Sequence, residues 1–309
     1  MKMPSGKVGG YLALTTTSIL WGTTWVVSKI ALRDIPAFQM TAIRQFVAGA
    51  IFILYFMLIK KQPLPTLAQF GRITILGFLL FVFANGLSTW GLLFISAGLG
   101  ALLGALYPLS VVMIERVFYG NKGFTPTMIL GFILGLTGVG LVFYESIIVV
   151  MTLKFILGVA LALIAMLSWS IGTVFLTRYK LGLNPYYSIG WQMLISGIGL
   201  YVMAVIFQPP VPLSSISVQG WGAVLYLVVF GSIIAFVAFI YSLKKLPVAI
   251  ASLYSYINPL VAFLLGALLL GEQLNMAIIW GALITLTGVF LVNFSLRKKI
   301  EQLRDDANV

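Results

Sequence analysis

Long apolar stretches dominate the chain, and each is bounded by charged residues or by residues that favour turns. A transmembrane helix needs about 20 such residues to cross the hydrocarbon core of a bilayer, whereas barrel strands would show alternating segments of about ten residues. The pattern therefore predicts an all-α membrane protein with ten transmembrane helices, over Gly10–Ala31, Ala37–Ile59, Arg72–Ile95, Gly98–Phe118, Thr127–Tyr144, Phe155–Thr177, Pro185–Phe207, Trp221–Leu243, Val248–Leu270 and Met276–Leu296.

The composition agrees with a chain that faces lipid over most of its surface. Of 309 residues, 61% are apolar and only 8% are charged, whereas a soluble domain averages about 25% charged residues. The chain has no Cys and no His, which excludes disulfides, thiolate metal ligands and a histidine base. We therefore expect no cofactor and no metal. The basic segment Met1–Gly9 runs into an apolar stretch too long for a signal peptide, so we expect it to be retained.

The distribution of Lys and Arg predicts the orientation of these helices. With the N-terminus in the cytoplasm, the outer loops hold only two cations, Arg33 and Lys154. The inner segments hold fifteen, namely Lys2, Lys7, Lys60, Lys61, Arg72, Arg116, Lys122, Arg178, Lys180, Lys244, Lys245, Arg297, Lys298, Lys299 and Arg304. This positive-inside asymmetry predicts a multi-pass inner-membrane protein with both termini cytoplasmic. The net charge of +12 thus indicates topology, and we expect no nucleic-acid partner.

The two halves of the sequence resemble each other. Landmarks recur at offsets of 150, 151 and 148 residues: Leu136–Val139 and Leu286–Val289, Pro108 and Pro259, Trp21 and Trp169. Each half contains five predicted helices, an odd number, so the second must insert upside down relative to the first. We predict a first repeat over residues 1–148, an inverted repeat over 149–296 and a cytoplasmic tail over 297–309. Inverted repeats are typical of carriers that alternate access around a central cavity.

Candidate binding residues fall near the middle of the predicted helices. Tryptophan prefers the membrane interface, so Trp21 and Trp169, at corresponding mid-helix positions, indicate a cavity wall, with helix–helix packing as the alternative. Trp25 follows Trp21 by one turn on the same face. Pro108 and Pro259 each remove a helical hydrogen bond and favour kinks or gating segments. The remaining candidates lie beside these prolines or across the bundle: Tyr107, Tyr254, Ser255, Asn258, Asn85 and Ser88.

Two cations fall inside predicted helices. Arg44 lies roughly 10 Å below the outer surface at 1.5 Å per residue, where a charge needs a partner or a wet cavity. A substrate carboxylate or phosphate could be that partner, and the alternative is a structural pairing with Glu272, which should emerge on the same side. Lys29 is nearer the outer end, where its amine can reach the surface. For Lys29, as for Arg44, substrate binding and a structural pairing with Glu272 are the two alternatives. Lys29 and Glu272 are thus candidate charges of the outer end.

The order and spacing of several motifs, from about Ala13 to Phe294, resemble the EamA-type permeases of the drug/metabolite transporter superfamily. The motifs are Trp21–Gly22, Lys29, Pro36, Arg44, Phe230–Phe236, Tyr241–Pro247, Asn258–Pro259 and Gly271–Glu272. The resemblance implies two inverted five-helix repeats and transport of amino acids, their derivatives or other small metabolites, outward in bacteria. The chain departs from the family pattern at Gly120–Asn121, where Gly–Glu is common, and at Gln192, which lies close to where the second half would mirror Arg44.

The positions of the acidic residues restrict the cargo. All seven lie in loops, at helix ends or in the tail: Asp34, Glu115, Glu145, Glu272, Glu301, Asp305 and Asp306. Proton-coupled exporters of organic cations commonly need a buried carboxylate. A neutral, zwitterionic or anionic cargo is therefore predicted, and a cationic-drug antiporter is disfavoured.

Together these features predict a carrier that exports a small metabolite, such as an amino acid or a derivative. A sugar phosphate or a lipid-linked sugar is the alternative cargo. A membrane enzyme is disfavoured because it typically needs acidic metal ligands or a His base in the membrane, and a receptor would not need matched mid-membrane Trp and Pro residues. The expected partners are a small-molecule substrate and the lipid bilayer, with the chain acting as a monomer or a homodimer.

Overall fold

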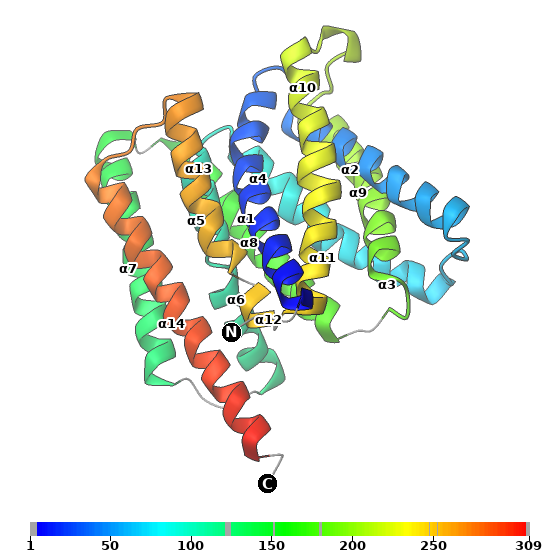
Figure 1. Ribbon diagram of the computed structural model, residues 1–309. Helices are drawn as coiled ribbons and strands as arrows, with labels where there is room; N and C mark the ends of the chain where they lie inside the picture. The colour runs from blue at the N-terminus through cyan, green and yellow to red at the C-terminus, as the bar shows by residue number, and fades with distance from the viewer. Residues whose placement is uncertain are drawn as a thin grey trace.

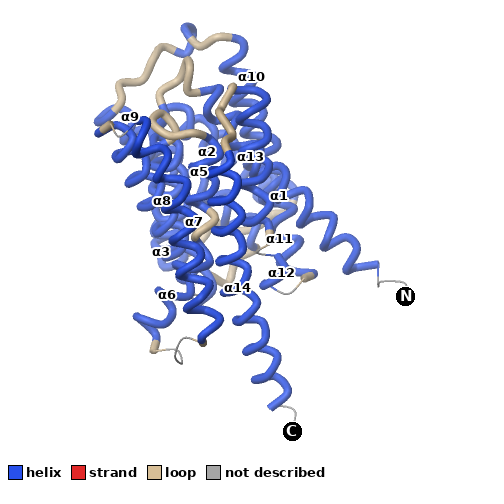
Figure 2. Tube along the Cα trace, turned by 90° about the vertical axis from the view of Figure 1, so that its left-hand side faces the viewer, coloured by secondary structure: helices blue, strands red, loops and turns tan. Residues whose placement is uncertain are grey.

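The computed structural model describes residues 5–120, 125–150, 152–178, 181–246, 248–251 and 253–306. Over these ranges it is a bundle of helices with no strand (Figures 1 and 2). In chain order the elements are α1 (Ser5–Ala31), α2 (Ala37–Leu54), η1 (Tyr55–Ile59), α3 (Leu67–Gly77), η2 (Phe78–Gly86), α4 (Leu87–Gly91), α5 (Ala97–Gly104), α6 (Tyr107–Tyr119), α7 (Pro126–Val150), α8 (Leu153–Arg178), α9 (Pro185–Phe207), η3 (Leu213–Ser215), α10 (Val218–Tyr226), η4 (Leu227–Ile234), α11 (Ala235–Lys245), α12 (Val248–Ala251), α13 (Tyr254–Leu270) and α14 (Met276–Asp306). Of these, η1, η2 and η4 are π-helical, and η3 is a 3₁₀ turn.

Seven helical runs in the described part of the chain are long and apolar enough to cross a membrane. They are Ala37–Ile59, Leu67–Gly91, Ala97–Tyr119, Leu153–Leu176, Pro185–Phe207, Val218–Lys245 and Met276–Ser295. Two shorter apolar helices, Pro126–Val142 and Tyr254–Leu270, accompany them. The last helix does not end at the predicted boundary, since α14 continues through the predicted tail to Asp306.

Helix α1 is less apolar than these runs because it carries hydroxyl side chains along its length. Thr17, Ser18, Thr24 and Ser28 are all buried in the bundle. Thr17 and Ser18 donate to the carbonyls of Ala13 and Leu14, one turn earlier, at 3.0 and 2.7 Å. Such local bonds satisfy a hydroxyl without water. The polar side of α1 therefore faces the protein interior.

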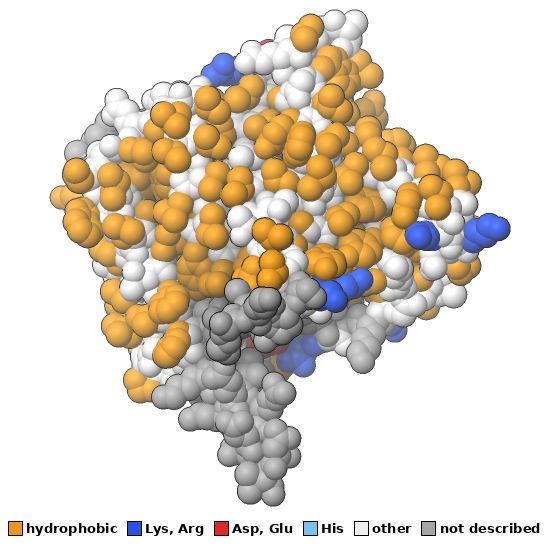
Figure 3. All heavy atoms as spheres, viewed as in Figure 1, with side chains coloured by type: hydrophobic (Ala, Val, Ile, Leu, Met, Phe, Trp, Pro, Cys, Tyr) orange, Lys and Arg blue, Asp and Glu red, His pale blue; other side chains and the backbone are white. Residues whose placement is uncertain are grey.

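The outer surface of the bundle is apolar. Large hydrophobic side chains are exposed on many helices, among them Leu58, Val117, Leu136 and Leu268, which are 72%, 70%, 66% and 70% exposed. Figure 3 shows one face covered mostly by hydrophobic side chains, with the few Lys and Arg residues in view toward its edges. An apolar surface of this extent is what a lipid environment requires.

Two helix pairs pack closely along their lengths, α7 with α14 and α2 with α9 (Figure 1). In the first pair, glycines meet backbone: a Cβ at Gly131 would lie 2.6 Å from the carbonyl oxygen of Gly288, and one at Gly281 would lie 2.7 Å from that of Gly138. The residue number rises from Gly131 to Gly138 on α7 while that of the contacted residue falls from Gly288 to Gly281 on α14, so the two helices are antiparallel. Gly131 and Gly281 are 150 residues apart, and so are Gly138 and Gly288. The contact of Gly131 with Gly288 is therefore repeated, with the two halves of the chain interchanged, in the contact of Gly281 with Gly138.

The two helical segments that contain Pro108 and Pro259 are interrupted. Helix α5 ends at Gly104, a turn occupies Ala105 and Leu106, and α6 begins at Tyr107 with Pro108 in its first turn. Helix α12 ends at Ala251, and α13 begins at Tyr254 with Pro259 inside it. Proline is tolerated in a first turn because that N–H has no helical partner, whereas Pro259 withholds a helical hydrogen bond.

Candidate functional site

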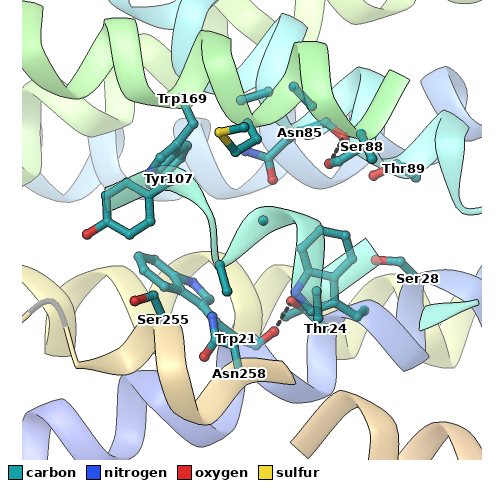
Figure 4. A pocket seen from close by; sticks show the side chains of 18 of the residues that line it. Trp21, Thr24, Ser28, Asn85, Ser88, Thr89, Tyr107, Trp169, Ser255 and Asn258 are labelled. Carbon is teal, nitrogen blue, oxygen red and sulfur yellow. Dashed lines mark hydrogen bonds between the residues drawn. The ribbon is translucent and has the colours of Figure 1, made fainter. Parts of the chain in front are cut away.

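A cavity of about 150 Å³ lies inside the bundle. Its lining includes every residue that the sequence suggests for substrate binding: Trp21, Trp25, Arg44, Asn85, Tyr107, Trp169, Tyr254, Ser255 and Asn258. These residues come from α1, α2, η2, α6, α8 and α13, so both halves of the chain form the site (Figure 4). Their role in binding remains a prediction, but their convergence on one cavity is a structural result.

Aromatic side chains gather at one end of this cavity, around Trp21. The ring of Trp21 lies edge-on to that of Trp169, with centroids 6.2 Å apart and planes at 88°. It also contacts Phe236 and Tyr254, at 5.0 and 4.9 Å. The indole N–H of Trp21 donates to the carbonyl of Gly231 at 3.2 Å, which allows a tryptophan to lie away from the membrane interface. Packing and cavity lining are thus both roles of Trp21.

Two tyrosines mark the places where the interrupted segments resume. Tyr107 begins α6 and Tyr254 begins α13, and their rings stack with centroids 5.9 Å apart and planes at 17°. The N-termini of both helices therefore lie beside the cavity. A helix N-terminus carries partial positive charge, which adds to the positive charge of Arg44 in the cavity wall.

Hydroxyl side chains occupy the other end, where Figure 4 shows Thr24, Ser28, Ser88 and Thr89 apart from the aromatic group. Of these four, only Ser88 is among the residues named from the sequence. Thr24 and Ser28 follow Trp21 by three and seven residues, which is the spacing of one helix face. That periodicity was the signal that could have identified them.

Arg44 is the charged residue that lines the cavity. It is only 5% exposed, and its Nε donates to the hydroxyl of Ser232 at 2.8 Å. No carboxylate of the described ranges forms an ion pair with it. The structural pairing with Glu272, the alternative to substrate binding, is made by Lys29 at 3.2 Å and not by Arg44. An arginine that is buried without an acidic partner attracts an anionic group from the cavity.

Two amides complete the polar lining. Asn85 donates from Nδ2 to the carbonyl of Leu80, five residues earlier, at 2.9 Å, as the π-helical geometry of η2 permits. The amide of Asn258 faces the carbonyls of Tyr254 and Ser18 at 2.9 and 2.8 Å, so its nitrogen is assigned to that side. This orientation ties α13 to α1 at the cavity wall.

The chemistry of the lining is thus that of a binding site for a small molecule. No group of three or more His, Cys, Asp or Glu side chains within the described ranges could hold a metal ion. The cavity combines aromatic faces, hydroxyls, amides and one guanidinium, a mixture that orients a ligand of mixed polarity.

Comparison with known proteins agrees with this arrangement. The sequence matches the EamA-like transporter family twice, over residues 8–144 and 156–294. It is 32% identical to the uncharacterized inner membrane transporter YedA of Escherichia coli K12, over 85% of this chain and 83% of that protein. It is 30% identical to the uncharacterized transporter sll0355 of Synechocystis, over 95% and 92%. A chloroplastic WAT1-related protein of Arabidopsis thaliana is 29% identical, over 94% and 71%.

A solved crystal structure shows the same fold, with a TM-score of 0.67 and 18% identity over 94% of this chain and 98% of that one. The family match covers both halves of the sequence and confirms the resemblance drawn from its motifs. The chain belongs to the EamA-like transporter family, and it is a multi-pass membrane protein of the transporter type.

Proposed function

We propose that this protein is a secondary transporter of the inner membrane that exports a small neutral, zwitterionic or anionic metabolite, such as an amino acid or a derivative, by alternating access. The observation that carries the proposal is the cavity shared by both halves of the chain, with Arg44 buried in its wall and no carboxylate in its lining. Relatives named as transporters support transport over catalysis.

The proposed architecture is ten membrane-spanning helices in two inverted repeats, with both termini in the cytoplasm. The antiparallel packing of α7 with α14 at positions 150 residues apart supports it, because a two-fold axis in the membrane plane relates two such helices. The start of α1 and the end of α14 lie toward the same end of the bundle (Figures 1 and 2). We call that end the terminal face, and the opposite end the Lys29 face.

The size and charge of the cavity favour a small cargo. A volume of about 150 Å³ is of the order that holds a benzene-sized ligand. A lipid-linked sugar is much larger, and a phosphate dianion would leave one of its charges without a cation in the lining. A cargo with a single carboxylate fits better, with that group at Arg44 and the rest against the aromatic end.

The test is transport by the purified protein in liposomes, with a panel of amino acids, organic acids, sugar phosphates and cationic dyes. Wild type is compared with Trp21→Ala and Arg44→Gln, and with Arg72→Gln, which removes an exposed arginine outside the cavity. We expect saturable flux of a zwitterion or an anion that both cavity substitutions reduce and Arg72→Gln does not. Saturable transport of cationic dyes alone would contradict the proposal.

A further inference from the structure

The side-chain oxygen of Gln192 is buried without a hydrogen-bond donor, at a position that alternating access would expose. Gln192 of α9 is only 1% exposed, and its Nε2 donates to the hydroxyl of Ser188 at 3.0 Å. Its Oε1 is buried without any hydrogen bond. A buried acceptor left unpaired costs about 1 to 3 kcal/mol, so the residue calls for an explanation beyond the packing seen here.

Gln192 occupies the position that corresponds to Arg44. The two are 148 residues apart, the offset that also relates Trp21 to Trp169, both of which line the cavity. Helices α2 and α9 reproduce this correspondence in their contacts: Gly49 packs against Leu194, and Gly197 packs against Phe46. Gly49 and Gly197 are 148 residues apart, and so are Phe46 and Leu194. The two contacts therefore join corresponding residues, with the two halves of the chain interchanged.

The surroundings of the two residues also correspond. A Cβ at Gly231, within the π-helical η4, would lie 3.2 Å from Nη2 of Arg44. A Cβ at Gly77, immediately before the π-helical η2, would lie 3.0 Å from the backbone oxygen of Gln192. Helix α2 thus packs against η4 and helix α9 packs against η2, with the first of these contacts made by the side chain of Arg44 and the second by the backbone of Gln192. Arg44 reaches the cavity from there, whereas Gln192 does not line it.

We propose that Gln192 is a second substrate-binding residue, which contacts the cargo when the cavity opens to the terminal face. This inference rests on the proposed function, because alternating access between inverted repeats exchanges the environments of corresponding residues. The cavity now extends along α1 from Trp21 to Ser28, in the direction of Lys29. In the state that opens to the terminal face, Gln192 takes the place that Arg44 has now, and its unpaired oxygen gains access to water or to a donor on the cargo.

The exchange makes the site asymmetric in charge. An anionic group meets a positively charged guanidinium at Arg44 but a neutral amide at Gln192, which offers fewer N–H donors and no opposite charge. An anion therefore binds more weakly from the terminal face than from the Lys29 face. The amide still selects for polar cargo, because both its donor and its acceptor must be satisfied.

The absence of Cys from the chain allows a direct test, since any introduced thiol is the only one. Arg44→Cys, Gln192→Cys and Gln45→Cys are compared in vesicles of known orientation, with a sulfonated, membrane-impermeant maleimide applied from either face. Gln45 is the matched control: it is 0% exposed, both its amide atoms are unpaired, and it lies on α2 outside the cavity lining. We expect Gln192→Cys to react from the terminal face at least about tenfold faster than Gln45→Cys, and Arg44→Cys to react from the Lys29 face.

If Arg44→Cys reacts and the wild type transports normally, a Gln192→Cys thiol that reacts no faster than Gln45→Cys overturns the inference and leaves the proposed function intact. Absence of flux in the wild type, together with an unreactive Arg44→Cys, overturns both the inference and the proposed function.

A second pair of variants, Gln192→Met and Gln45→Met, guards against misfolding. Gln192→Met should raise the KM at the terminal face roughly tenfold, the loss of one hydrogen bond to a charged group. Equal KM values in the two Met variants would contradict the inference.

Discussion

The amine of Lys29 and the carboxylate of Glu272 lie 3.2 Å apart, and this ion pair joins the first half of the chain to the second. Glu272 also accepts hydrogen bonds from the backbone N–H groups of Ala97, at 2.7 Å, and Gly98, at 3.4 Å, which begin α5. Lys29 donates further to the carbonyl of Ile95 at 2.6 Å. Gly271, with φ of +67°, ends α13 in a left-handed turn that delivers Glu272 to this site.

We expect Glu272→Ala to lower the thermal stability of the detergent-solubilised protein more than Glu272→Gln. The Ala variant loses the ion pair and the helix cap together, about 3 kcal/mol for a largely desolvated pair, whereas Gln can still accept from the N–H groups of α5. The control is Glu115→Gln, which breaks the pair with Arg178 at 3.7 Å, where the side chains are 37% and 35% exposed. Exposed pairs contribute less than about 1 kcal/mol. Equal losses in melting temperature for all three variants would contradict this account of Glu272.

The contact between α7 and α14 depends on glycines that have no room for a side chain. We expect Gly138→Ala to destabilise the protein by about 1 to 3 kcal/mol, because its Cβ would overlap the backbone of Thr285 and the carbonyl oxygen of Gly281. Gly140→Ala, on the same helix but with open space around it, should be neutral or stabilising by up to about 1 kcal/mol. Unfolding midpoints of the two variants measure the difference. Similar midpoints would show that the close approach is not required.

The two prolines should differ in their effect on transport. Pro259 lies inside α13, so Pro259→Ala restores an N–H that can bond to the carbonyl of Ser255 and stiffens the helix. We expect a several-fold lower maximal flux with an unchanged KM, because the change between states slows. Pro108 lies in the first turn of α6, where an added N–H finds no helical partner, so Pro108→Ala should change flux less than twofold. The prediction fails if both variants transport alike.

Much of the site could be predicted from the sequence because its residues violate ordinary membrane preferences. Trp21 and Trp169 fall at mid-helix positions and Arg44 lies within a helix, and in a membrane such positions require a cavity or a partner. Thr24 and Ser28 were missed because hydroxyls in membrane helices commonly bond to their own backbone, as Thr24 does to the carbonyl of Trp21 at 2.6 Å. Their functional placement depends on which face of α1 turns inward.

Other features could not be read from local sequence. The partner of Glu272 is Lys29 and not Arg44, which depends on how far apart α1, α2 and the end of α13 lie in the folded bundle. The interruptions end at Leu106 and Leu253, two residues before Pro108 and six residues before Pro259, so packing and not the proline alone selects the site of each break. The π-helical η2 and η4 have the same kinds of apolar residues as the α-helices beside them, so tertiary contacts decide their geometry.

The measurement that tests the central claim most directly is the charge selectivity of transport at Arg44. Flux of a carboxylate cargo is compared with flux of its uncharged amide analogue, in liposomes that contain wild type or Arg44→Gln. If Arg44 holds an anionic group in the cavity, wild type should prefer the carboxylate by at least about tenfold, equivalent to ~1.4 kcal/mol, and Arg44→Gln should lose that preference. A carboxylate-to-amide ratio that is the same in both proteins would contradict the account.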